Sequence, residues 1–206
     1  MRHSMVGGLA AAALCLAGPA FAIEAQKVGE ALNFDQENTR VGVDVRAGLG
    51  GFTGDLADDT GVGPLLGINA GAQPWRLIGI EAGYEGQRIP IDEALVGDGE
   101  GIWRHNVGLL AKVGPLLDEK WRPFVGAGAG LSYLNPSEGA EGSFDNDFIT
   151  ELPLAAGVDY RLGNIFAGAR ATYRVLGGEE FVETPGVADD EKGSLFNASI
   201  TVGGRF

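Results

Sequence analysis

Apolar and polar residues alternate along eight segments of this 206-residue chain. In segment 41–49, every odd position from Val41 to Leu49 is apolar, whereas the even positions are Gly42, Asp44, Arg46 and Gly48. Side chains of a β-strand point to its two faces in turn, so this pattern predicts strands with one apolar and one polar face. The other segments are 66–73, 78–85, 103–113, 125–133, 154–162, 165–174 and 196–206.

The apolar faces of these segments carry no charged residue, although charged residues make up 21% of the chain. Helical periodicity is nearly absent, and no stretch beyond the first residues approaches 18 consecutive apolar positions. We therefore predict an all-β protein, an eight-stranded antiparallel up-and-down β-barrel.

Two kinds of barrel fit such strands. In a water-soluble, calycin-like barrel the apolar faces point inward, whereas in an outer-membrane barrel they face lipid and the polar faces line the inside. Here the polar faces carry charges of both signs among many glycines, which leave room for long side chains in a narrow barrel. This favours a membrane barrel with a salt-bridged interior. The predicted interior charges are Asp44, Arg46, Glu81, Glu85, Arg104, Lys112, Asp159, Arg161, Arg170, Arg174 and Arg205.

Aromatic residues fall near the predicted strand ends on the apolar faces. Because successive strands run in opposite directions, they form two groups, one at each end of the barrel, as expected at the two interfaces of a lipid bilayer. The first group is Tyr84, Trp103, Tyr133, Tyr173 and Phe196, and the second is Trp75, Trp121, Tyr160 and Phe206.

The predicted connections alternate between short and long, as in outer-membrane barrels. Apart from Glu85, which is counted with the interior charges, the long ones, 50–65, 85–102, 134–150 and 175–195, hold 17 of the 28 acidic residues and only two bases, Arg88 and Lys192. We interpret them as a solvated acidic surface, with divalent-cation bridging to lipopolysaccharide as an alternative. The acids are Asp55, Asp58, Asp59, Asp92, Glu93, Asp98, Glu100, Glu138, Glu141, Asp145, Asp147, Glu179, Glu180, Glu183, Asp189, Asp190 and Glu191.

Residues 1–22 have the pattern of a secretory signal peptide. Arg2 precedes an apolar stretch that ends at Pro19, and Ala20-Phe21-Ala22 forms an A-x-A cleavage site. Cleavage would remove the only cysteine, Cys15. We expect a short periplasmic lead-in over 23–38 and a barrel over 39–206. A formal net charge of −13 argues against nucleic-acid binding.

Three stretches resemble the small eight-stranded outer-membrane barrel family, the OmpA-transmembrane-domain and opacity-protein type. They are Arg122–Tyr133 (RPFVGAGAGLSY), Ala156–Leu162 (AGVDYRL) and the terminal strand Phe196–Phe206. The resemblance implies location in the bacterial outer membrane. Because the sequence ends at Phe206, we expect no peptidoglycan-binding domain.

In that family, a C-terminal phenylalanine preceded by alternating apolar residues is the signal read by the barrel-assembly machinery. Phe206, with Gly204, Val202 and Ile200, matches this signal. The resemblance thus implies the assembly machinery and periplasmic chaperones as partners during biogenesis, and outer-membrane lipid and lipopolysaccharide in the mature state.

The sequence offers little for catalysis. His105 is the only histidine after the signal peptide, and its parity places it on the lipid-facing side beside Trp103. It lacks the H-x-S pattern expected of a lipid A deacylase, and no Asp/His pair of an omptin-like protease is evident. We expect no enzyme activity, no cofactor and no metal site. The predicted function is structural or surface-interacting, with a plugged interior; a narrow channel or carrier for small solutes is the alternative.

Overall fold

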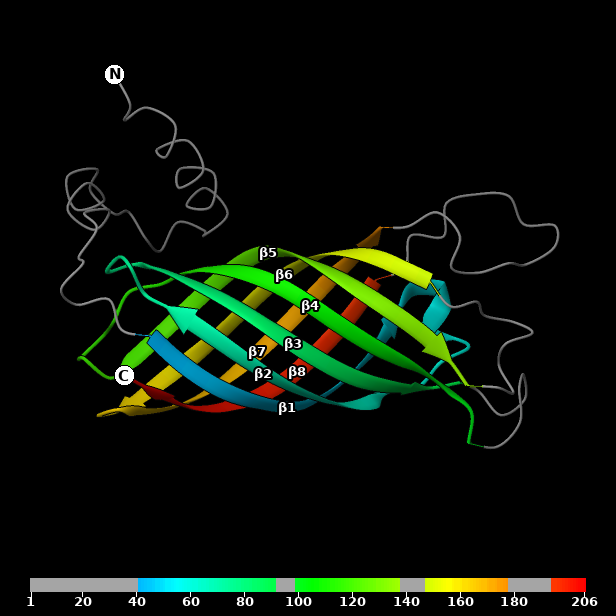
Figure 1. Cartoon of the computed structure of the whole chain (residues 1–206), viewed down its shortest axis with the longest axis horizontal. Helices are drawn as coiled ribbons and strands as arrows, with labels where there is room; N and C mark the ends of the chain where they lie inside the picture. The colour runs from blue at the N-terminus through cyan, green and yellow to red at the C-terminus, as the bar shows by residue number, and fades with distance from the viewer. Residues whose placement is uncertain (1–40, 92–98, 138–146, 178–193) are drawn as a thin grey trace, which may run out of the picture.

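The computed structural model describes residues 41–91, 99–137, 147–177 and 194–206, and these form a closed antiparallel β-barrel (Figure 1). The predicted signal peptide and lead-in lie outside the described residues. The eight strands follow in chain order as β1 (Val41–Thr53), β2 (Gly63–Ala72), β3 (Ile78–Pro90), β4 (Gly101–Val113), β5 (Trp121–Pro136), β6 (Asp147–Leu162), β7 (Ile165–Gly177) and β8 (Ser194–Arg205).

Each strand pairs with its neighbours in sequence, and β8 closes the barrel against β1. In that closing pair Val45 lies opposite Val202 and Ala47 opposite Ile200. Closure satisfies the backbone hydrogen bonds of every strand, which a spanning sheet needs because the bilayer core offers no water. The predicted up-and-down barrel is therefore confirmed.

The connections alternate in length as predicted. Residues 73–77, 114–120 and 163–164 join strands at one end, called here the short-connection end, where Phe206 also lies (Figure 1). Gly163 has a φ of 62°, which glycine adopts without strain in a two-residue turn. The other end, the long-connection end, carries 54–62, 91–100, 137–146 and 178–193, the first of which begins with the 3₁₀ helix η1 (Gly54–Ala57).

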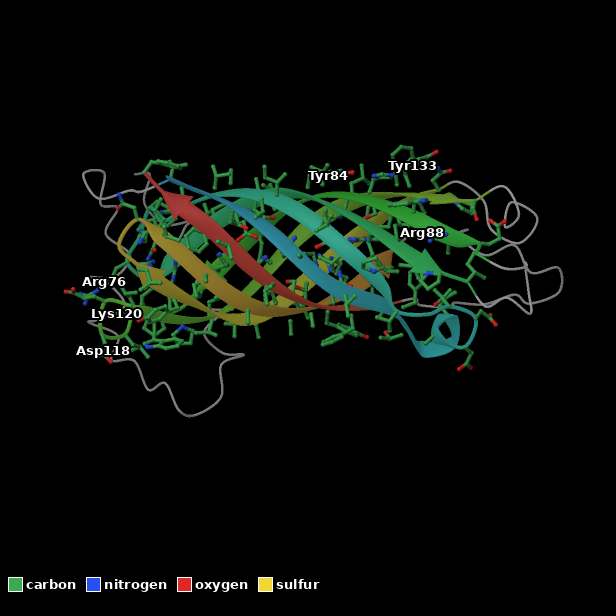
Figure 2. All side chains as sticks on the ribbon, turned by 90° about the horizontal axis from the view of Figure 1, so that it is seen from below. Arg76, Tyr84, Arg88, Asp118, Lys120 and Tyr133 are labelled. Atoms are coloured by element: carbon green, nitrogen blue, oxygen red, sulfur yellow. The ribbon has the colours of Figure 1, made fainter. Side chains whose placement is uncertain are left out.

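The apolar faces point outward, as predicted. Leu66, Val107 and Ile200 are 69%, 64% and 65% exposed, whereas inward charged residues such as Asp44, Glu81 and Arg104 are buried. Figure 2 shows the side chains on both sides of the barrel wall, with Tyr84 and Tyr133 on its outside. Within the described residues, no helix is long and apolar enough to cross a membrane.

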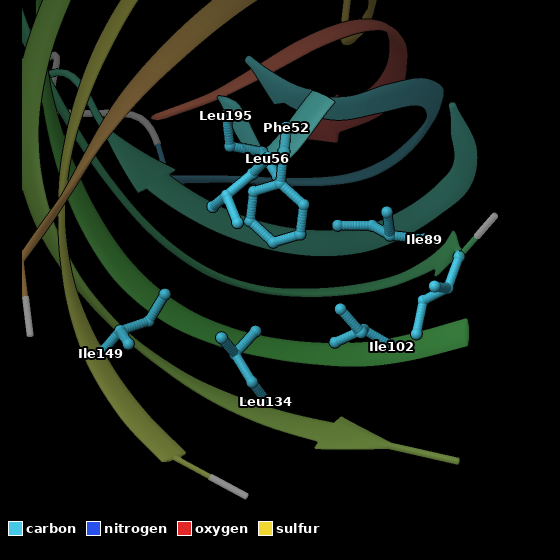
Figure 3. Close-up of a cluster of buried hydrophobic side chains, with 8 residues drawn as sticks. Phe52, Leu56, Ile89, Ile102, Leu134, Ile149 and Leu195 are labelled. Atoms are coloured by element: carbon cyan, nitrogen blue, oxygen red, sulfur yellow. The ribbon is translucent and has the colours of Figure 1, made fainter. Parts of the chain in front are cut away.

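The interior differs from the prediction at the long-connection end. There the inward positions carry a buried hydrophobic cluster, called here the apolar cap (Figure 3). We predicted long connections over 50–65 and 85–102, and these bounds were wrong because the strands extend further, to Thr53 in β1 and Pro90 in β3. The apolar cap comprises Phe52, Leu56, Ile89, Ile91, Ile102, Leu134, Ile149 and Leu195.

We predict that Gly157→Ala destabilises the barrel. A Cβ at Gly157 would stand 2.7 Å from Cζ of the inward-pointing Phe124 and 2.5 Å from the Ala169 carbonyl oxygen. Such overpacking costs about 1–3 kcal/mol. At Gly79, also an inward position, the nearest atom to a Cβ would be 3.4 Å away. Urea unfolding of the reconstituted protein should therefore shift for Gly157→Ala and not for Gly79→Ala; equal shifts would contradict the packing described.

Candidate functional site inside the barrel

The centre of the barrel is built around Glu85 on β3. Its carboxylate lies 2.9 Å from Arg46 Nη2 of β1, 2.8 Å from Arg104 Nη1 of β4 and 3.0 Å from Arg174 Nη2 of β7. Asn197 of β8 donates a further hydrogen bond of 3.2 Å. Glu85 is 2% exposed, and the three arginines are also buried. One carboxylate thus gathers side chains from four other strands.

Glu151 of β6 completes this central cluster. Arg104 donates to both of its carboxylate oxygens, at 2.7 and 2.6 Å, and Arg174 Nε lies 3.1 Å away. Glu151 was not among the predicted interior charges, because the predicted segment 154–162 begins after it, whereas β6 begins at Asp147. Continuing the alternation of β6 backward through Pro153 places Glu151 on the inward parity, so the signal was present.

A second cluster lies around Glu81, four residues earlier on β3. Arg170 of β7 binds its carboxylate with both terminal nitrogens, each at 2.7 Å, and Lys112 of β4 lies 2.8 Å away. Lys112 is also 3.8 Å from Asp159 of β6. The ring of Phe124 lies beneath both cations, 5.0 Å from Lys112 Nζ and 5.5 Å from Arg170 Cζ. Paired charges and this aromatic contact fill the lumen at this level.

Eight of the eleven predicted interior charges thus meet in these two clusters. Of the remaining three, Asp44 accepts a 2.6 Å hydrogen bond from Asn69, and Arg161 donates to Gln73 Oε1 at 2.6 Å. Arg161 and Arg205 line a cavity at the short-connection end. Arg122, which the sequence analysis did not count, lines the same cavity.

Small cavities lie within the described part of the barrel, two of which are lined by the interior charges. One of about 40 Å³ lies among the central residues Arg46, Glu151 and Arg174, and one of about 60 Å³ lies at the short-connection end. Each has room for a few water molecules. The buried polar atoms with no partner in the described structure include Arg46 Nε, Arg174 Nη1 and both amide atoms of Gln87. Arg46 and Arg174 line the central cavity, so water there would satisfy their unpartnered nitrogens.

The aromatic residues predicted for the two rims lie on the outer surface. At the short-connection end, Trp121 and Tyr160 are cross-strand neighbours with ring centroids 4.5 Å apart, and Trp75 lies in the adjoining turn. On β4 and β5, Trp103 and Tyr133 lie toward the opposite end, and Tyr173 faces Phe196 across β7 and β8. The placement agrees with two outward groups, except that Tyr84 lies at the midpoint of β3.

His105 is on the outer surface, as its parity indicated. Its Nδ1 is 2.7 Å from the Tyr84 hydroxyl oxygen, and its ring stacks with that of Trp103 at 6.5 Å. No carboxylate contacts it in the described structure, so a proton-relay geometry is absent there. In the described residues, no three His, Cys, Asp or Glu side chains gather as a metal site would require.

The terminal residues proposed as an assembly signal occupy β8 and its end. Ile200 and Val202 point outward, 65% and 52% exposed, and Phe206 is 84% exposed beyond the strand. The backbone N–H of Phe206 donates to the Val41 carbonyl, which ties the end of the chain to the start of β1. The residues are thus accessible from outside the barrel.

We predict that Glu85→Gln strongly destabilises the protein. Three buried guanidinium groups would lose their shared carboxylate, and breaking a buried ion pair typically costs about 3–5 kcal/mol. The exposed Asp58→Asn provides a matched control that also removes one acidic charge. The measurement is the free energy of unfolding in detergent or lipid. Equal stability of the two variants would show that Glu85 is not required for interior packing.

Neither a family model nor a curated protein matches the sequence. Solved structures do resemble the fold. Neisserial surface protein A is similar with a TM-score of 0.58 and 16% identity, over 82% of this chain and 97% of that one. Ail of Yersinia pestis, in complex with the heparin analogue sucrose octasulfate, gives 0.54 at 13% identity, over 82% and 99%. The outer membrane protein OprG of Pseudomonas aeruginosa gives 0.51 at 14%, over 82% and 95%. The chain therefore has the fold of the small eight-stranded outer-membrane β-barrels.

Proposed function

We propose that this protein is a bacterial outer-membrane barrel with a structural and surface-interaction role, and that its interior conducts no solute. The observation that carries the proposal is the filled lumen. The ion-pair clusters around Glu81 and Glu85 span it from wall to wall, and the apolar cap lies above them. An eight-stranded barrel is only wide enough for its own side chains, which fits this arrangement.

The outer surface supports a membrane location. Its exposed aliphatic side chains would be costly in water, whereas lipid is a favourable environment for them. The inward charges exclude the reverse arrangement of a calycin-like barrel, in which apolar side chains fill the centre. Outer-membrane lipid and lipopolysaccharide are the proposed neighbours of this surface, with the short-connection end in the periplasm.

The acidity of the long connections limits what they could bind. Ail, a structural neighbour, is known in complex with a polysulfated sugar analogue. In this chain the predicted long connections hold 17 acids and two bases, so they would repel a polyanion. We propose instead that they stay solvated or bind cationic partners, with divalent cations bridging to lipopolysaccharide phosphates as the alternative. Most of these acids lie outside the described residues.

The terminal strand supports a proposed role in assembly. Its outward Ile200 and Val202 and the terminal Phe206 remain accessible when the barrel is closed. Recognition by the barrel-assembly machinery, after delivery by periplasmic chaperones, would use these residues before β8 pairs with β1. We propose no catalytic role. Neither the wild type nor a His105→Ala variant should modify lipid A.

A narrow channel or carrier is the second candidate, because two cavities lie along the lumen. We predict that refolded protein produces no steady conductance in planar bilayers. Arg104→Ala should leave the protein closed as well, because the apolar cap does not depend on that side chain. Steady single-channel currents from the folded wild-type protein would reject the closed interior and favour the channel.

We also predict that the protein fractionates with outer membranes and migrates differently on gels before and after heating. Closed membrane barrels resist unfolding by detergent at room temperature because all their strand edges are paired. Recovery in the soluble fraction of cells without detergent would contradict the proposed location.

A further inference from the structure

One charged residue faces outward from the wall of the barrel. Along the outward-facing positions of the eight described strands, Arg88 on β3 is the only Asp, Glu, Lys or Arg. The sequence analysis assigned it to a long connection, but β3 extends to Pro90, and Arg88 is exposed on the same face as Tyr84. A charge on a lipid-facing wall is costly unless it reaches the polar interface or an oppositely charged group.

The guanidinium group of Arg88 has no carboxylate partner among the described residues. Its Nη2 donates to the carbonyl oxygen of Gly99, 2.5 Å away, which is an electrically neutral acceptor. The neighbouring acid, Glu100, accepts a hydrogen bond from Ser137 instead. Because a guanidinium group has five N–H donors, most of those of Arg88 remain available to an acceptor outside the barrel.

Polar side chains continue this position across the neighbouring strands. Arg88 lies opposite Trp103 of β4, which lies opposite Asn135 of β5. Both of these residues are exposed on the outer face. The guanidinium, indole N–H and amide groups are all hydrogen-bond donors. Figure 2 shows Arg88 and Tyr133 nearer to the long-connection end than Tyr84. This outward row can therefore donate to an anionic oxygen at that end of the wall.

The adjoining row, toward the middle of the strands, is aromatic. It holds Gly86, His105 and Tyr133 on β3, β4 and β5. The hydroxyl oxygen of Tyr84 lies 2.7 Å from His105 Nδ1, and a Cβ at Gly86 would be 3.5 Å from the same hydroxyl. Tyr84 therefore leans over Gly86 toward Arg88, although its backbone lies at the midpoint of β3. Such amphipathic rings favour the interface between headgroups and acyl chains.

The wall beyond this row is aliphatic. Val107, Leu109 and Leu131 are the next outward residues of β4 and β5 with large side chains, and they are 64%, 60% and 50% exposed. The outer face of β3–β5 thus passes from a cation, through aromatic rings, to aliphatic side chains. A phosphorylated lipid presents the complementary order, from its phosphate to its acyl chains.

The other half of the barrel lacks this arrangement. On β7, β8, β1 and β2, the outward polar side chains are few and uncharged, namely Thr53, Tyr173 and Ser194. The acidic long connections would repel anionic headgroups around the rim. Charge complementarity therefore favours the face of β3–β5 for contact with an anionic lipid.

We propose that the outward face of β3–β5 is a binding site for a phosphorylated lipid of the outer leaflet, with Arg88 as the ligand of the phosphate. Trp103 and Tyr133 contact the lipid next to its phosphate, and the aliphatic wall contacts its acyl chains. The inference rests on the proposed outer-membrane function and assigns one lipid contact to named residues. The ligand is a lipid rather than a free anion, because the site continues into a wall that suits acyl chains.

The test titrates the full mature chain, refolded in a non-ionic detergent, with phosphorylated lipid A or with dephosphorylated lipid A that has the same acyl chains. Native mass spectrometry measures the fraction of barrels that carry a lipid. The wild type should bind the phosphorylated form about tenfold more tightly, and Arg88→Gln should bind both forms equally, because the charge-assisted hydrogen bond is lost. Arg88→Lys, which keeps the charge, should retain a preference. The control is Arg76→Gln, which removes an exposed base at the short-connection end and should behave as the wild type.

Two results would overturn the proposal. One is equal affinity of the wild type for the two lipids, or a preference that persists in Arg88→Gln. The other is a barrel dimer without bound lipid that dissociates in Arg88→Gln, because the face would then belong to a second copy of the chain. Heat-modifiable gel mobility confirms that each variant is folded. Loss of the phosphate preference leaves membrane fractionation and conductance unchanged, so failure of this inference is distinguishable from failure of the proposed function.

Discussion

The glutamates of β3 and β6 hold the interior together, because charges in a narrow lumen must be compensated inside the barrel. Glu85 binds arginines from β1, β4 and β7, and Glu81 binds Arg170 of β7 across the lumen. Glu151 shares Arg104 and Arg174 with Glu85. A buried ion pair adds little stability over a well-packed apolar pair, but loss of one partner is costly. The clusters therefore add little to the stability of the barrel, but they make substitution of any one of their members costly.

Around these clusters the interior has three levels, and each suggests a different role. The apolar cap places buried aliphatic and aromatic side chains in the lumen at the long-connection end. The ion pairs join distant strands and oppose changes of the barrel's cross-section. The cavity at the short-connection end is lined by charges of both signs, and there Arg122 donates to Gln73. A barrel with this filled interior is better suited to support surface loops than to conduct solutes, and the proposed function follows from this.

Much of this fold is readable from the alternation of residues. Asp44 and Arg46 between valines indicate both the strand and its inward face, and the same logic placed His105 outside. The prediction failed at the strand ends, where inward positions are apolar or where the strand begins earlier than the alternation indicates. Phe52 and Ile89 have inward parity but are apolar, so the alternation ends before them and both were predicted to lie in long connections rather than in the apolar cap. The predicted segment 154–162 covered only the later part of β6, so Glu151 was missed.

The sequence predicts which charged side chains point into the lumen, but it does not predict which of them form ion pairs with each other. Parity along β7 places Arg170 and Arg174 in the lumen, but which glutamate each one meets depends on how the strands are staggered around the closed barrel. The hydrogen bonds of Arg122 show the same limit, since its acceptors come from two different turns. Alternation within one strand carries no information on that stagger.

The central claim is that aliphatic side chains contact lipid while charged ones line the lumen. Because the chain has no cysteine after residue 22, single cysteines can be introduced and spin-labelled at successive positions of β8 from Ala198 to Val202. Collision with oxygen, which concentrates in the bilayer, should be high at 198, 200 and 202 and low at 199 and 201 in reconstituted vesicles. The opposite alternation, or equal access to a water-soluble relaxation reagent at all five positions, would contradict the account.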